Sequence, residues 1–244
     1  GLPVMLEKCR ALDNSCIKTQ VTGPVTYLMS LAKRDGKSVI FDDDFSEAMM
    51  FGLAMKGLWQ TREIRKIGKT PILFFDEPSL GDVSSAYTPV TGEWARSLMK
   101  SILGFVKNFD PDLLIGIHCC SNTDWGMLLG LGVDIVSLDS CSCGDRLMLY
   151  PDEVRRFLQK GGFIAYGIVP MSKYSHSITE EHLYDKFMSL LDGFEERGIA
   201  KREILDSAIF TPACGMGPLR VQDAGRILDL VISLTERIQE RHNP

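Results

Sequence analysis

Short apolar segments alternate with longer helical patterns along the chain, and this alternation limits the fold more than any other feature of the sequence. Several of these segments are apolar throughout, as is typical of parallel strands covered on both faces. The expected strands are residues 18–22, 71–75, 113–117, 134–138, 163–169 and 208–211. The expected helices are residues 5–12, 46–68, 92–108, 124–131, 152–159, 179–197 and 222–241. This order predicts an α/β fold with a parallel sheet, either open and doubly wound or closed into a barrel.

Local signals at the ends of these segments support the expected helices. Asp152 and Thr179 are polar residues at the points where helical patterns begin, as is typical of helix starts. Gly68, Gly161 and Gly198 stand where helices are expected to stop. Because no low-complexity linker interrupts the pattern, we expect a single domain over residues 1–244.

The choice between an open sheet and a barrel depends on motifs and on the number of strands. The sequence has no Gly-x-Gly-x-x-Gly after a strand and no Gly-x-x-x-x-Gly-Lys, which disfavours a nucleotide-binding open sheet. A complete (β/α)8 barrel has eight strands in typically about 250 residues, whereas only six good strands are expected here. A barrel would therefore lack its first two βα units, which either lie upstream or come from a second chain.

Composition narrows the class of protein. The formal net charge is −5, so the chain does not attract nucleic acid or an anionic membrane electrostatically. The first ten residues lack the pattern of a signal peptide, and no apolar stretch approaches the length of a membrane span. These features predict a soluble, cytoplasmic protein.

The seven cysteines are an odd number in a long chain, so metal binding, catalysis or burial is expected rather than a disulfide framework. Cys9, Cys16 and Cys119 are expected to be buried. Cys141 and Cys143 are expected in a solvent-accessible loop, with a metal-ligand pair as the alternative. Three histidines are expected to be solvated: His176, His182 and His242.

Polar residues follow the expected strands at the points where the strands end. They are Asp76-Glu77, His118-Cys119-Cys120, Asp139 and Cys214. In a β/α barrel, the carboxyl ends of all strands share the face on which active sites are built. The alternative for Asp76 and Glu77 is a structural role, in which they cap the following helix or pair with a base.

His118 and Cys120 are two residues apart, so both side chains lie on one side of an extended segment and Cys119 faces away. Cys214 would arrive from the last strand. A neutral imidazole and two thiolates are a normal zinc set, and three protein ligands leave a fourth position for substrate. Asp139 is a tentative further ligand that could complete this shell or exchange within it.

Four motifs, taken in order, resemble the catalytic domain of cobalamin-independent methionine synthase. The wider superfamily includes uroporphyrinogen decarboxylase and corrinoid-dependent thiol methyltransferases. The similarity runs from about Lys18 to Arg220. The motifs are Val21-Thr22-Gly23-Pro24-Val25-Thr26, Phe75-Asp76-Glu77-Pro78, His118-x-Cys120 and Thr211-Pro212-Ala213-Cys214-Gly215.

This resemblance implies a TIM-type β/α barrel and a zinc ion held by His118, Cys120 and Cys214. The family's fourth ligand is a glutamate, and Asp139 occupies the matching stretch here. Asp76 matches the family's acid that holds the amino group of homocysteine, so Asp76 is expected to be catalytic and, with Glu77, to bind substrate. The family's histidine in the loop after the seventh strand has no clear counterpart.

The resemblance also implies an activity, which is methyl transfer to the thiol of homocysteine to give methionine. The methyl donor would be a folate or a methylated corrinoid protein, and a homo-oligomer is left open. Three alternatives remain at this point. They are methyl transfer to another thiol such as coenzyme M, a decarboxylase of the uroporphyrinogen type, and a non-catalytic barrel with structural zinc.

Overall fold

A computed structural model describes residues 1–83, 85, 88, 90–171 and 175–242. Contacts divide the chain into two compact units. Unit 1 comprises Gly1–Cys119 and Leu131–Asp134, and unit 2 comprises Cys120–Gly130 and Ile135–Pro244. We predicted one domain over residues 1–244, and the division into units leaves that statement a prediction.

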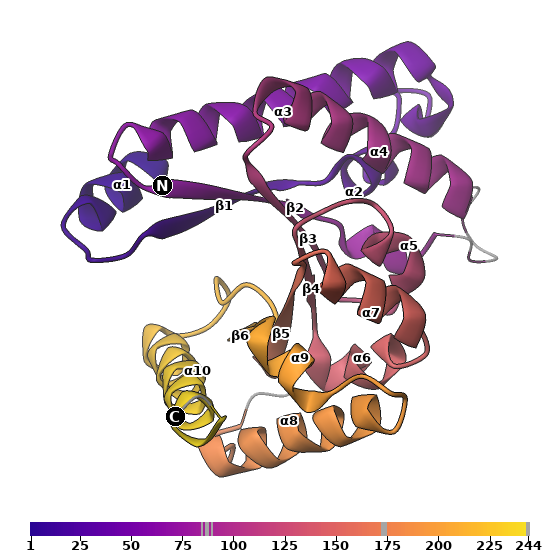
Figure 1. The fold of residues 1–244 in the computed structure, drawn as a ribbon. Helices are drawn as coiled ribbons and strands as arrows, with labels where there is room; N and C mark the ends of the chain where they lie inside the picture. Colours follow the sequence, from indigo (N-terminus) through magenta and orange to yellow (C-terminus); the bar gives the residue numbers. More distant parts are fainter. Residues whose placement is uncertain (84, 86–87, 89, 172–174, 243–244) are drawn as a thin grey trace. The chain divides into compact units, whose positions relative to one another are not determined.

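Unit 1 contains three parallel strands in chain order among its described residues (Figure 1). They are β1 (Cys16–Thr22), β2 (Thr70–Asp76) and β3 (Leu114–Cys119). The strand register aligns Thr22 with Asp76 and Asp76 with His118. The helical elements of the unit are α1 (Leu2–Arg10), α2 (Pro24–Met29), η1 (Val39–Phe41), α3 (Asp43–Arg65), η2 (Pro78–Gly81) and α4 (Gly92–Phe109).

Helix α3 packs against one face of the unit 1 sheet. Along β1 the buried residues alternate with exposed ones, and the buried set includes Thr19, whose hydroxyl donates to Gln60 Oε1 on α3 at 2.6 Å. Leu73 of β2 packs against Gly57 of α3, where an added Cβ would lie 2.8 Å from the leucine side chain. Helix α3 therefore covers one face, and the alternate residues of β1 lie on the other.

Unit 2 also contains three parallel strands among its described residues. They are β4 (Ile135–Leu138), β5 (Phe163–Val169) and β6 (Ala208–Pro212). Tyr166 and Phe210 from two of these strands pack edge-on against Phe187. The helices are α5 (Trp125–Leu129), α6 (Ser140–Leu147), α7 (Pro151–Gln159), α8 (Glu180–Glu195), α9 (Lys201–Asp206) and α10 (Val221–His242).

The α/β class and the six predicted strands are confirmed, each strand with ends within two residues of the expected ones. The glycine stops are confirmed as well, since Gly68, Gly161 and Gly198 have φ of 77°, 83° and 76° after their helices. Closure into a TIM-type barrel, and the absence of its first two βα units, stay predictions. None of the described helices has both the length and the apolarity needed to span a membrane.

Several expectations about single residues were wrong. Cys141 and Cys143 lie in helix α6 rather than in a loop, and Cys143 is buried. Cys16 is exposed because it lies on the uncovered face of β1, and Cys9 is only half-buried. His242 is half-buried, and its Nε2 lies 3.1 Å from the Tyr184 hydroxyl.

Candidate metal centre

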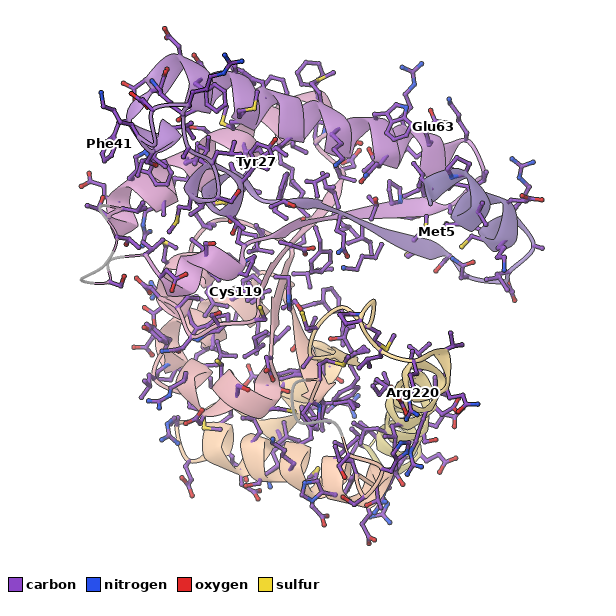
Figure 2. All side chains as sticks on the ribbon, turned by 180° about the vertical axis from the view of Figure 1, so that it is seen from behind. Met5, Tyr27, Phe41, Glu63, Cys119 and Arg220 are labelled. Atoms are coloured by element: carbon purple, nitrogen blue, oxygen red, sulfur yellow. The ribbon has the colours of Figure 1, made fainter. Side chains whose placement is uncertain are left out.

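The end of β3 presents its side chains as the spacing predicted. Cys119, labelled in Figure 2, is fully buried, whereas His118 and Cys120 on either side are half-buried. The ligand atoms of His118, Cys120 and Cys214 all lie within 4.8 Å of one another. Ligands at typical Zn–N and Zn–S lengths stand roughly 3.5–3.8 Å apart around a tetrahedral ion, so small side-chain rotations would bring these three onto one ion.

The two thiols of this group belong to unit 2 and influence each other electrostatically. Burial raises the pKa of the Cys120 thiol, and the neighbouring Cys214 raises it further. Two thiolates at this separation repel each other, and a divalent cation removes that repulsion because metal ligation deprotonates thiols. The donor set therefore fits zinc.

A glycine allows the chain that carries Cys214 to pack closely against β5. The N–H of Ala213 donates to Val169 O at 3.0 Å. A Cβ on Gly167 would lie 2.6 Å from Ala213 Cα and 2.7 Å from Leu138 O, which are both backbone atoms. A larger residue than glycine at position 167 would therefore displace the segment that ends in Cys214.

The predicted ligand Asp139 has other partners in the structure. Its Oδ1 accepts from the N–H groups of Cys141 at 2.9 Å and Ser142 at 3.1 Å, and its Oδ2 accepts from the Ser142 hydroxyl at 2.8 Å. Asp139 is the N-cap of α6, and the only group of metal-ligating residues found in the described part of the chain does not include it. Ligation by Asp139 stays a prediction.

The two cysteines of α6 are not among the candidate metal ligands. Cys141 Sγ donates to Ile168 O at 2.9 Å, and Cys143 is buried. Burial raises the pKa of both thiols. Among the described residues neither joins the group formed by His118, Cys120 and Cys214.

Glu77, at the end of β2, caps a helix. Its side chain is fully buried, and its two oxygens accept from the N–H groups of Val25 at 2.9 Å and Thr26 at 2.7 Å. A Cβ on Gly23 would lie 2.2 Å from the Glu77 side chain, so only glycine admits this contact. Burial raises the pKa of Glu77 to about 7 despite these hydrogen bonds. The capping alternative expected Glu77 to cap the following helix, but its side chain caps α2, which precedes it in the sequence, and makes no cap hydrogen bond to η2. Substrate binding by Glu77 stays a prediction.

Asp76 differs from its neighbour because its carboxylate has no hydrogen-bonding partner among the described residues, although its backbone carbonyl accepts from the N–H of Gly23 at 2.8 Å. It is half-buried and stands beside His118 in the strand register. Burial raises the pKa of its carboxyl, and the charge of Lys18 opposes the shift. The carboxylate of Asp76 therefore lies beside a candidate metal ligand and is not engaged by another described residue, and a catalytic or substrate-binding role for Asp76 stays a prediction.

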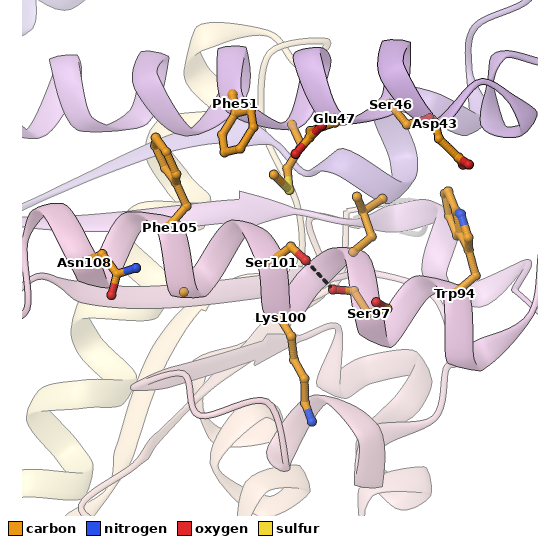
Figure 3. Close-up of a pocket in the computed structure, with 13 residues that line it drawn as sticks. Asp43, Ser46, Glu47, Phe51, Trp94, Ser97, Lys100, Ser101, Phe105 and Asn108 are labelled. Atoms are coloured by element: carbon orange, nitrogen blue, oxygen red, sulfur yellow. Dashed lines mark hydrogen bonds between the residues drawn. The ribbon is translucent and has the colours of Figure 1, made fainter.

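Two grooves in the described residues are separate from these side chains. The groove in unit 1, shown in Figure 3, has a volume of about 640 Å³ and lies between α3 and α4, with Phe51, Trp94 and Phe105 among its walls. The groove in unit 2 has a volume of about 770 Å³ and is lined by residues of α9, β6 and α10. Neither is lined by Asp76 or by the three metal-ligand candidates.

Comparison with known proteins supports the fold. No protein-family model matches the sequence, and no curated protein sequence matches it. One similar solved structure is the "Putative Vitamin-B12 Independent Methionine Synthase" from Listeria monocytogenes, with a TM-score of 0.59 and 16% sequence identity. The match covers 96% of this chain and 69% of that chain. At this identity the likeness shows a shared α/β fold.

Proposed function

We propose that this protein is a zinc-dependent methyltransferase that transfers a methyl group to the thiol of homocysteine and so forms methionine. The observation that carries the proposal is the convergence of His118, Cys120 and Cys214, whose ligand atoms lie within 4.8 Å of one another. The fold it shares with the Listeria protein supports the same assignment.

His118, Cys120 and Cys214 would hold the zinc ion through one imidazole and two thiolates. When bound, zinc supplies a Lewis acid that keeps a substrate thiol deprotonated near neutral pH, where a free thiol with a pKa near 8.5 is mostly protonated. Three protein ligands leave one position for that sulfur. Asp139 is left out of this proposed ligand set because both of its carboxylate oxygens accept hydrogen bonds at the start of α6.

Asp76 would fix the orientation of the acceptor. Its half-buried carboxylate stands beside His118 in the strand register and has no hydrogen-bonding partner among the described residues. A substrate ammonium group held there would place the sulfur near the metal ligands and limit its rotation. This carboxylate favours an acceptor that carries an amine, such as homocysteine, over coenzyme M, which carries none.

The methyl donor is proposed to be a folate or a methylated corrinoid protein. A decarboxylase of the uroporphyrinogen type needs no thiolate metal site, so the paired thiols of Cys120 and Cys214 favour the methyltransferase.

Substitution of a thiolate ligand tests the proposal. Cys214→Ser should remove both bound zinc and methyl transfer to homocysteine, measured by metal analysis and by methionine formation. Cys16→Ser is the matched control because Cys16 is exposed on β1 and outside the ligand group. Full zinc content or full turnover in Cys214→Ser would refute the proposal.

A further inference from the structure

The face of the unit 1 sheet opposite α3 carries a second charged group near Asp76. Lys18 lies on β1 on the same side as Cys16, Gln20 and Thr22, opposite the residues that contact α3. Lys18 is the register partner of Ile72 on β2, which lies four residues before Asp76. At a rise of about 3.3 Å per residue, this places the Lys18 backbone roughly 13 Å before the ends of the strands.

The Lys18 side chain shortens that distance by extending toward the strand ends. Its Nζ donates to Gln20 Oε1 at 2.5 Å and lies 4.6 Å from the centroid of the Phe74 ring. Gln20 and Phe74 are register partners, and Asp76 is two residues beyond Phe74. The ammonium therefore lies roughly one side-chain row, about 6–7 Å, below the row of Asp76 and His118.

Lys18 and Asp76 interact through space without closing a direct ion pair. Partial burial lowers the pKa of the Lys18 ammonium, and the charge of Asp76 opposes that shift. The reciprocal effect of Lys18 lowers the pKa of Asp76. Two opposite charges that share a face without pairing can each bind the opposite charge of one molecule that carries both.

We propose that Lys18 binds the carboxylate of an α-amino acid whose ammonium group is held by Asp76, so that this face of the sheet selects zwitterionic substrates. The assignment rests on the proposed function, in which the acceptor's sulfur reaches the metal. It adds a residue that determines specificity: an acceptor thiol without a carboxylate would leave Lys18 without its ligand.

Phe74 and Gln20 position the ammonium for this role. The Phe74 ring lies over Gly116, where an added Cβ would be 2.4 Å from the ring. Because Gly116 has no side chain, the ring can occupy this position, in which Lys18 Nζ lies over it. The Gln20 amide oxygen accepts from the ammonium. An ammonium has three N–H donors, and the one hydrogen bond to Gln20 leaves two for a carboxylate.

Binding of three related ligands to the full chain tests the proposal without catalysis. They are L-methionine, 3-(methylsulfanyl)propylamine, which lacks the carboxylate, and 4-(methylsulfanyl)butanoate, which lacks the ammonium. Calorimetry gives each Kd for wild type, Lys18→Met and Lys18→Arg. Lys37→Met is the matched control because Lys37 is a highly exposed lysine that pairs with Asp35.

Wild type should bind methionine more tightly than either analogue. Lys18→Met should weaken methionine and the butanoate roughly 10- to 100-fold, the usual value of a hydrogen-bonded charge, and leave the amine within about twofold. Lys18→Arg should keep most of the preference for the carboxylate. Equal weakening of all three ligands in Lys18→Met, or no preference for methionine in wild type, would overturn the proposal.

The outcome separates this assignment from the proposed function. If methionine binds with the expected dependence on Lys18 but no methyl transfer to homocysteine is detected, the zwitterion site stands and the methyltransferase assignment fails. If methyl transfer occurs but Lys18→Met affects all ligands equally, the methyltransferase assignment stands and the zwitterion site fails. Thermal unfolding of each variant shows whether it is folded.

Discussion

The ends of β2 and β4 both present acids in the sequence, but the structure uses them differently. At the end of β4, Asp139 is followed at once by α6, and its carboxylate accepts from N–H groups at the start of that helix. At the end of β2, Glu77 caps α2, whereas Asp76 has no such partner among the described residues. In this chain, two of the three acids cap a helix, and only the carboxylate of Asp76 is left as a candidate for substrate binding.

The largest expected effect distinguishes the two neighbouring acids of β2. Glu77→Ala leaves the N–H groups of Val25 and Thr26 without an acceptor in a buried place and should lower the free energy of unfolding by roughly 3 kcal/mol. Asp76→Asn should change it by less than about 0.5 kcal/mol. Denaturant titration measures both, and equal losses would contradict the comparison.

The pH dependence of stability sharpens the comparison further. Glu77 has a pKa of about 7 in the folded protein, above the ordinary value of 4.5. The unfolded chain therefore loses this proton first. The contribution of Glu77 to stability is fully present below about pH 4.5 and is lost as the pH rises through 7, by up to roughly 3 kcal/mol.

Glu77→Gln removes this titration and is the variant that isolates it. Denaturant titrations at pH 5 and pH 8 should show a smaller loss of stability with rising pH in Glu77→Gln than in wild type. If the two proteins lose the same amount, the titration of Glu77 contributes nothing.

The smallest expected effect concerns the acid of β4. Asp139→Ala removes an N-cap and should lower the free energy of unfolding by about 1 kcal/mol, while zinc content stays the same. Metal analysis and thermal unfolding measure the two quantities. Loss of zinc in Asp139→Ala would show that Asp139 is a metal ligand and that its carboxylate leaves the N–H groups of α6 when the metal binds.

The strands and long helices were predictable because apolar periodicity reports burial, and burial forms these elements. Short helices were not. Helix α6 begins with Ser-Cys-Ser-Cys, whose residues have weak helix propensity, and its start depends on the Asp139 cap. Helix α2 has only six residues, and its one signal in the sequence was Gly23-Pro24, since proline is common at the first helical position.

The metal-ligand candidates were predictable from spacing and from the resemblance, but their surroundings were not. Two consecutive acids after a strand point to opposite sides, and the sequence does not say which one meets a helix start. Gly23 and Gly167 were missed because only the packed structure shows which atoms a Cβ would meet. Lys18 had one signal, a charged residue at the start of an expected strand, and we did not interpret it as functional.

The central claim is that His118, Cys120 and Cys214 hold zinc with one position left for a substrate sulfur. X-ray absorption of the zinc-loaded protein, with and without homocysteine, tests it most directly. The account predicts one nitrogen and two sulfur ligands from the protein, and one added sulfur near ~2.3 Å when homocysteine is bound. An unchanged zinc environment with four protein ligands would contradict it.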